Sequence, residues 1–307
     1  MLAPNILFLT CLSMLAFAGN SLLCRLALRT TRIDAASFTT VRLASGAIML
    51  ALLVLLRERA ARRRSIPPAL NASTGKKANW LSALALYAYA AAFSFAYTSL
   101  STGTGALLLF GTVQAGMIGY GLSQGERFNL VQWLGLACAC AGLIWLLLPG
   151  VAAPPLAGAL LMIVAGLSWA VYSLRAKGAG DPTEVTAGNF IRAAVFAAAF
   201  SLANLNYVSL DGRGIGYALL SGVMASGIGY AVWYTALRSI PATVAAVVQS
   251  SVPVLAAIGG VLLLDERFSL RLALASVAIL GGVTLVIMRK GPAAPDIKKP
   301  RPGPDRA

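Results

Sequence analysis

The sequence predicts an all-α membrane protein with ten transmembrane helices, arranged as two five-helix repeats of inverted topology. Three observations lead to this prediction: the composition, the spacing of apolar segments, and short motifs that recur in the second half of the chain. Of the 307 residues, 58% are hydrophobic and only 11% are charged, whereas a soluble chain carries about 25% charged residues. Together with a mean hydropathy of +0.78, this deficit indicates that a lipid bilayer is the solvent.

Ten segments have the length and composition of a transmembrane helix, which needs about 20 mostly apolar residues. They cover residues 5–28, 35–56, 79–100, 103–122, 130–148, 157–177, 184–204, 214–237, 242–264 and 269–289. The first is too long for the apolar core of a signal peptide and no basic residue precedes it, so we expect it to be retained. We expect Arg57 to Ala78, and the basic, proline-rich tail, to be mobile and aqueous.

The distribution of lysine and arginine predicts the orientation of the chain. With ten spans, 17 of the 25 basic residues lie on the side of both termini, 6 lie on the other side, and two lie inside spans. The positive-inside rule then places both termini in the cytoplasm, and we expect a multi-pass protein of the bacterial inner membrane. Because topology accounts for the net charge of +15, we expect no nucleic-acid partner.

Several kinds of chemistry are excluded by composition. The chain has no histidine, which excludes histidine metal sites, histidine-activated nucleophiles and histidine proton relays. Its four cysteines, Cys11, Cys24, Cys138 and Cys140, lie in or beside apolar segments and are interpreted as small apolar residues without a disulfide framework. We therefore expect neither an enzyme nor a metal or other cofactor. No selectivity element of an ion channel is present in the sequence either.

Motifs at equivalent span ends reveal an internal repeat. Gly-Glu-Arg-Phe at 125–128 follows the fourth span, and Asp-Glu-Arg-Phe at 265–268 follows the ninth, 140 positions later. Tyr97-Thr98-Ser99-Leu100 similarly resembles Tyr234-Thr235-Ala236-Leu237. Two pairs of arginines keep an offset of 150, Arg25 with Arg175 and Arg42 with Arg192. Because each half holds an odd number of spans, the second half must enter the membrane from the opposite side.

The repeat divides the chain into a first five-span repeat over 1–149, an inverted second repeat over 150–290, and a basic cytoplasmic tail over 291–307 that we expect to be disordered. At these positions the sequence resembles the drug/metabolite transporter superfamily, in particular its ten-span branch with two EamA-like repeats. The resemblance rests on the two motifs after spans four and nine, on the intramembrane arginines, and on Gln249-x-x-x-Pro253. It covers about residues 5–290, and overall similarity is greatest to YddG-type amino-acid exporters.

This resemblance implies a bundle around a central cavity, alternating access, and export of amino acids, with aromatic and other neutral ones among the substrates. The alternative within the same superfamily is an exporter of drugs or other small metabolites. None of the ten acidic residues is mid-span, whereas proton-coupled carriers keep a membrane-embedded carboxylate. We therefore expect facilitated transport. We also expect a monomer, whose partners are its small-molecule substrate and the lipid bilayer.

Mid-span amides and aromatic side chains are the candidate substrate-binding residues. An amide both donates to a carboxylate and accepts from an ammonium group, which suits a zwitterion, and aromatic rings combine apolar area with a polar group. The alternatives are interhelical hydrogen bonding and core packing. The candidates are Asn20, Tyr89, Phe110, Gln114, Trp169, Tyr172, Tyr230, Trp233, Gln249 and Ser250.

Two further features of the spans bear on function. Pro253 removes a backbone donor in the ninth span, and we expect a bend there that acts as a gate. Arg42 and Arg192 are the only basic residues well inside spans. Each is either a counter-charge for a substrate carboxylate or a structural residue that snorkels or bonds helix carbonyls. Their symmetric placement favours the structural role for both.

Overall fold

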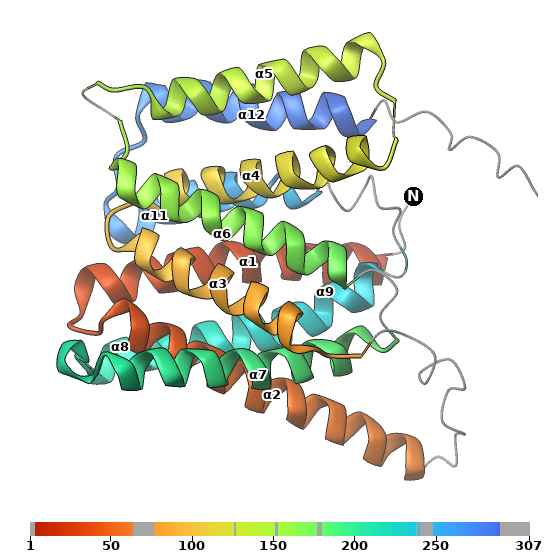
Figure 1. Ribbon diagram of the computed structural model, residues 1–307, viewed down its shortest axis with the longest axis vertical. Coiled ribbons are helices and arrows are strands. Elements are labelled where there is room, and N and C mark those ends of the chain that lie inside the picture. The colour runs from red at the N-terminus through yellow and green to blue at the C-terminus, as the bar shows by residue number, and fades with distance from the viewer. Residues whose placement is uncertain are drawn as a thin grey trace, which may run out of the picture.

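A computed structural model describes residues 4–63, 77–125, 127–150, 153–176, 180–237, 239 and 248–288. All regular elements in these ranges are helices that run roughly side by side (Figure 1). They are α1 (Pro4–Thr30), α2 (Ala35–Arg63), α3 (Trp80–Tyr97), α4 (Thr102–Ser123), α5 (Leu130–Leu147), α6 (Leu156–Arg175), α7 (Pro182–Ala203), η2 (Leu205–Tyr207), α8 (Gly212–Leu220), η3 (Ser221–Ile228), α9 (Gly229–Leu237), α11 (Val252–Leu264) and α12 (Leu270–Met288).

The helices confirm the predicted all-helical membrane fold. Within the described ranges, nine helices are long and apolar enough to cross a bilayer, when α8, η3 and α9 are counted as one from Gly212 to Ala236. The shorter apolar helix α11 lies in the predicted ninth span, whose residues 242–247 are outside the described ranges. Leucines, isoleucines and valines cover the outside of the bundle, as expected where lipid surrounds it. The chain is therefore a multi-pass membrane protein.

Helix α2 corrects one boundary of the sequence prediction. A loop was expected from Arg57, but α2 continues to Arg63. The extension contains mainly Arg, Glu and Ala, which have high helix propensity. Two arginines in its last turn also interact favourably with the negative end of the helix dipole. Arg57 Nη1 also donates to Thr183 Oγ1 at 3.0 Å, which links this turn to α7. The predicted tail 291–307 lies outside the described residues.

Short side chains in the connections determine where α2 begins. The Asp34 carboxylate accepts hydrogen bonds from Ala36 N and Ser37 N, both at 2.9 Å, and thereby caps α2. It also accepts from Ser209 N at 2.8 Å, which ties this connection to the one before α8. Burial alone would raise the pKa of Asp34, but the hydrogen bonds from Ser37, Ser209 and Ala36 outweigh it and lower that pKa. The connections at this end of the bundle are thus fixed to one another.

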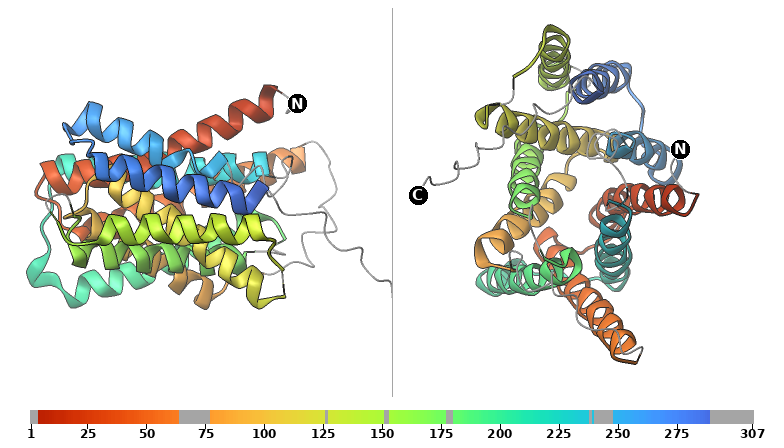
Figure 2. Two further views of the ribbon diagram at one scale, coloured as in Figure 1. Left: turned by 90° about the horizontal axis from the view of Figure 1, so that it is seen from above. Right: turned by 90° about the vertical axis from the view of Figure 1, so that its right-hand side faces the viewer.

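The packing of the helices follows the sequence repeat. When each span is replaced by the span five places away along the chain, pairs of spans that pack together become other pairs that pack together. Helix α3 packs on α6, and α1 correspondingly packs on α8, η3 and α9; α4 packs on α6, and α1 on α11. The pairs α2–α7, α4–α11 and α5–α12 each unite a span with its own counterpart. Figure 2 shows α5 and α12 together at one end of the bundle. This arrangement is consistent with two inverted repeats.

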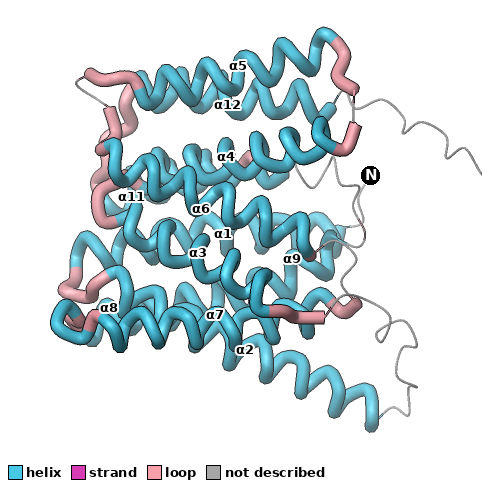
Figure 3. Tube along the Cα trace, viewed as in Figure 1, coloured by secondary structure: helices cyan, strands magenta, loops and turns pink. Residues whose placement is uncertain are grey.

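Close contact of α5 with α12 depends on glycine. A Cβ atom at Gly135 would lie 2.7 Å from the carbonyl oxygen of Gly282, and one at Gly142 would lie 2.7 Å from Ala278 Cβ. Small residues at such crossings let two backbones approach closely in a membrane. In the tube view of Figure 3 these two helices lie at one edge of the bundle, where they pack on α4.

Candidate functional site

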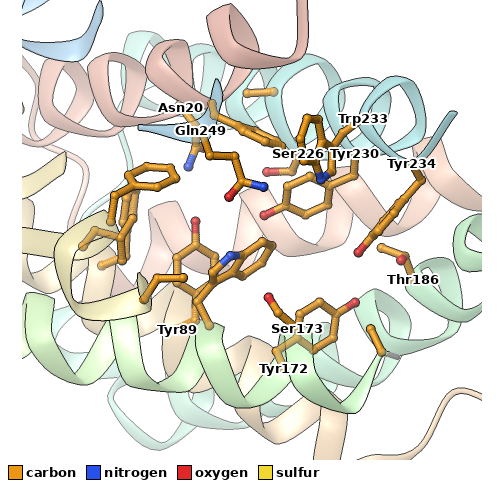
Figure 4. Close-up of a pocket in the computed structure, with 18 of the residues that line it drawn as sticks. Asn20, Tyr89, Tyr172, Ser173, Thr186, Ser226, Tyr230, Trp233, Tyr234 and Gln249 are labelled. Atoms are coloured by element: carbon orange, nitrogen blue, oxygen red, sulfur yellow. The ribbon is translucent and has the colours of Figure 1, made fainter. Parts of the chain in front are cut away.

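A cavity of about 360 Å³ lies inside the bundle, between α1, α3, α4, α6, α7, η3 and α9. Its volume is within the range of about 300–1,000 Å³ that is typical of small-molecule sites. Nine of the ten predicted binding residues line it together: Asn20, Tyr89, Phe110, Gln114, Trp169, Tyr172, Tyr230, Trp233 and Gln249. The fold thus brings mid-span residues from both halves of the chain to one site (Figure 4).

The other two predicted functional residues lie elsewhere. Ser250 faces a groove beside α12 and Cys138, outside the central cavity. Pro253 is buried in the first turn of α11, and a turn at Ser250 and Ser251 precedes that helix. A break in the helix before Pro253 is what a missing backbone donor favours, while its action as a gate stays a prediction.

Aromatic rings form one wall of the cavity around Trp169. The Trp169 ring centroid lies 4.7 Å from that of Tyr89, 5.5 Å from Tyr172 and 5.4 Å from Tyr230. Phe17 closes the cluster with an edge contact to Tyr230 at 5.7 Å. Offset and edge contacts at these distances are the favourable geometries for aromatic pairs. This wall can therefore accept a flat apolar group against several rings.

Several cavity residues escaped the sequence prediction, although a signal for them existed. Ser226 and Tyr234 lie four residues to either side of Tyr230 and line the same cavity. Phe17 precedes Asn20 by three residues and lines it as well. Residues three or four apart share one face of a helix. Extending each mid-span candidate by this spacing would have identified all three.

Polar groups converge beside the aromatic wall, two of them the hydroxyl groups of its own tyrosines. Figure 4 shows the side chains of Asn20, Gln249, Tyr89 and Tyr230 directed toward a common space. Asn20 Oδ1 accepts a hydrogen bond from Ser221 Oγ at 2.7 Å, so the Asn20 amide is held from behind. The site therefore combines an apolar surface with a few converging polar groups, which is the usual composition of a ligand pocket.

The segment η3 supplies one polar group of the cavity, Ser226, and one that supports Asn20, Ser221. It is a π-helix, in which hydrogen bonds run from i to i+5, so Ser221 and Ser226 lie on the same face. Ser221 contacts Asn20 and Ser226 contacts Arg42. Within η3, Gly222 permits the approach to α2, because a Cβ there would contact the Arg42 carbonyl oxygen. π-Helical turns occur frequently at functional sites.

The two intramembrane arginines have different environments, although their symmetric placement in the sequence favours the same structural role for both. Arg42 is only 1% exposed and donates to Ser226 Oγ at 3.2 Å and to Tyr89 Oη at 3.3 Å, both in the cavity wall. Arg192 is half-buried, donates to the Gly188 carbonyl at 2.8 Å and lies over the exposed Trp80 ring. Equal offsets in sequence did not give equal surroundings, because α2 faces η3 where α7 faces the outside of the bundle.

An ion pair lies beyond one end of the cavity. Arg25 Nε lies 3.4 Å from Glu266 Oε1, and Arg25 Nη1 donates to the Tyr97 carbonyl at 2.7 Å. Glu266 Oε2 accepts from Thr102 N at 2.7 Å. These bonds join α1, the end of α3, the start of α4 and the connection after α11. They therefore close the bundle at this end.

In the other direction the cavity extends to the connection between α6 and α7. Its lining includes Ala176, at the end of α6, and Pro182, at the start of α7. Among the described residues, none that lines the cavity lies as far toward the Arg25 end as the ion pair itself. The lining of the cavity therefore reaches the end of the bundle where α6 ends and α7 begins, and it stops short of the opposite end.

A helical membrane protein with an internal repeat and a central cavity that extends to one side only has the architecture of a membrane transporter. Comparison with known proteins agrees. The model of the EamA-like transporter family matches residues 156–288. An uncharacterized protein of Pseudomonas aeruginosa is 54% identical over 289 residues, which cover 94% of this chain and 96% of that protein. The uncharacterized transporter YoaV of Bacillus subtilis is 27% identical over 169 residues, which cover 52% of this chain and 58% of YoaV.

The chain belongs to the EamA-like transporter family, within the drug/metabolite transporter superfamily. A protein of known crystal structure has the same fold, with a TM-score of 0.61 over 92% of this chain and 97% of that chain at 18% sequence identity. Membership of this family implies that the chain transports a small molecule across the bilayer.

Proposed function

We propose that this transporter exports amino acids, aromatic and other neutral ones, by alternating access, as do the YddG-type exporters that it resembles. The observation that carries the proposal is the composition of the cavity. A wall of four aromatic rings, Trp169 with Tyr89, Tyr172 and Tyr230 around it, offers a surface for an apolar side chain. The amides of Asn20, Gln114 and Gln249 offer both donors and acceptors to a zwitterionic backbone.

The direction of transport follows from the orientation of the chain. We propose the bacterial inner membrane as its location, with both termini in the cytoplasm, because the basic residues are concentrated on the side of the termini. The α6–α7 connection is then cytoplasmic, and the cavity faces the cytoplasm in this conformation. An exporter loads its substrate in such a state, so the closed Arg25 end is the side of release.

The mechanism proposed is facilitated transport by a monomer. Among the described residues, none of those that line the cavity is an aspartate or a glutamate, and the sequence has no histidine. Without a titratable group of this kind, a proton has no site at which it would couple to the substrate. Transport would then follow the gradient of the substrate itself.

Counterflow in proteoliposomes tests the proposal. Liposomes loaded with unlabelled amino acid and containing the full chain are expected to accumulate labelled phenylalanine, tryptophan or leucine transiently. Trp169→Ala and Gln249→Ala should reduce the rate, whereas Trp133→Ala, on the exposed face of α5, should not. Absence of exchange for every amino acid would refute the proposal, and exchange of other metabolites or drugs instead would establish the alternative.

A further inference from the structure

We infer that one wall of the cavity, formed by Asn20, Tyr89 and Ser226, is a binding site for a carboxylate group of the substrate, with Arg42 as the residue that positions it. This inference deepens the proposed function, because it takes the cavity as the substrate site. It concerns the chemical class of the ligand and does not depend on which amino acid is transported. The argument rests on the direction of the hydrogen bonds behind the wall.

Arg42 orients two hydroxyl groups toward the cavity as donors. A guanidinium group has five N–H donors and no acceptor. Ser226 Oγ accepts from Arg42 Nε and Tyr89 Oη accepts from Arg42 Nη2, so neither hydroxyl can donate back to Arg42. Neither donates to any other described residue. Their protons are thus available to an acceptor in the cavity, which both residues line.

Asn20 adds a third donor by the same principle. Its Oδ1 accepts from Ser221 Oγ at 2.7 Å, which assigns the NH₂ group to the other side of the amide. Figure 4 shows the nitrogen of Asn20 directed toward the space between Gln249 and Tyr89. The π-helical register of η3 supplies both supporting contacts, from Ser221 to Asn20 and from Ser226 to Arg42. Two of the three donors, Asn20 and Ser226, are therefore fixed by η3, and the third, Tyr89, is fixed by Arg42 of α2.

The charge of Arg42 favours an anion at this wall. No carboxylate of a described residue lies within ion-pair distance of its guanidinium, and Nη1 is buried without a hydrogen-bond partner in the part of the chain that the structure describes. The group lies 5.4 Å from the Tyr89 ring centroid and 5.1 Å from that of Phe93, and both rings line the cavity. Buried charges in proteins are usually paired. A substrate carboxylate would supply the missing negative charge through the two hydroxyl groups.

Arg192 can be compared with Arg42 within the same chain. It occupies the equivalent position of the second repeat, yet it bonds a helix carbonyl and an exposed ring. The repeat therefore does not require an arginine that faces the cavity on both sides. Of these two arginines, only Arg42 is placed behind hydroxyl groups of the cavity wall, which argues for a role toward the ligand.

A site built from donors discriminates against ligands that cannot accept. An analogue whose carboxylate is replaced by an amide brings donors of its own and no charge. An amine without a carboxylate leaves the three donors unpaired and adds a cation beside Arg42. Sites with fixed polar groups reject such analogues strongly, because the buried groups then remain without partners.

Binding to the purified full-length protein, followed by tryptophan fluorescence, tests this inference. The probes are phenylalanine, 3-phenylpropionate, phenylalaninamide and phenethylamine. The first two carry a carboxylate and should bind roughly tenfold or more tightly than the last two. Tyr89→Phe and Ser226→Ala should each weaken the binding of 3-phenylpropionate by roughly tenfold and leave that of phenethylamine unchanged. Arg42→Gln should abolish the preference, and the matched variant Arg192→Gln should keep it.

Three outcomes would overturn the inference. These are equal binding of phenylalanine and phenylalaninamide, an equal loss for all probes in Tyr89→Phe and Ser226→Ala, and no binding of either carboxylate probe to the wild type. The two hydroxyl variants decide the matter even where Arg42→Gln does not fold. Failure of amino-acid counterflow with intact, hydroxyl-dependent binding of 3-phenylpropionate would refute the proposed function alone. Counterflow of amino acids without a carboxylate preference would refute this inference alone.

Discussion

Replacing Glu266 with glutamine tests whether its ion pair keeps the cavity closed at the Arg25 end. The two side chains are largely buried, at 8% and 14% exposure, so solvent screens them less than a surface pair. Glutamine keeps the carbonyl that accepts from Thr102 N and loses the charge that faces Arg25. Hydrogen bonds to charged groups contribute about 1.5–3 kcal/mol, and the length of 3.4 Å places this bond at or below the lower limit. We therefore expect a shift of about 1.4 kcal/mol toward the state open at this end, or roughly tenfold in population.

Thiol labelling from the Arg25 side measures this shift. A cysteine in place of Ser21, which lines the cavity, is introduced after the four native cysteines are replaced. An impermeant maleimide then labels it only when this end opens, so its rate should rise roughly tenfold in Glu266→Gln. Glu184→Gln, an exposed glutamate at the start of α7, is the matched control and should leave the rate unchanged. An unaltered rate in Glu266→Gln, with an unaltered unfolding temperature, would refute the role of the ion pair.

Three further predictions concern packing, capping and the aromatic wall. Gly282→Leu should destabilise the protein by about 1–3 kcal/mol or more in thermal unfolding, because its Cβ would meet the Gly135 backbone, whereas Gly281→Leu has open space and should not. Asp34→Ala should lower the unfolding temperature, by the loss of a cap of about 1 kcal/mol. Hydrogen bonds lower the folded-state pKa of Asp34. The contribution of its carboxylate to stability is therefore complete above the unfolded-state pKa of about 3.9 and disappears as pH falls through the folded-state pKa. Melting curves between neutral and acidic pH should show this loss of stability in the wild type only. Trp169→Ala should raise the KM of any substrate with an aromatic side chain more than that of a small one, and equal effects on both would contradict the role of the ring cluster.

The fold was predictable because its determinants are local. A span is an apolar segment of sufficient length, and its ends carry capping residues such as Asp34 and Asn129, whose side chains bond the first turns of α2 and α5. The end of α2 was missed because its basic turns have helix propensity but no apolar pattern. The cavity residues were predictable to the extent that a polar or aromatic residue at mid-span needs a reason to be there.

The surroundings of Arg42 could not be predicted, because they depend on contacts between distant segments. Its partners Tyr89 and Ser226 are 47 and 184 positions away, and no spacing rule within a helix links them. Symmetry in the sequence pointed to equal roles for Arg42 and Arg192. The difference arises from which helix each arginine faces, and this follows only from the packing of the two repeats.

The cavity is asymmetric although the scaffold around it is repeated. At the offset of 150 that relates the first and sixth spans, Trp169 corresponds to Gly19 and Asn20 corresponds to Ala170. A large side chain in one repeat is thus matched by a small one in the other, so the two sides of the cavity offer different chemistry. The rings of Trp169 and Tyr172 come from α6, whereas the donors Asn20 and Ser226 come from α1 and η3, and Tyr89 joins the two groups because it contacts both Trp169 and Arg42. A repeated scaffold can pack in two related states of similar free energy, while unequal walls would hold a substrate in one orientation in both. In the proposed mechanism the asymmetry therefore determines which molecule is bound, and the repeat provides the two states between which the protein moves.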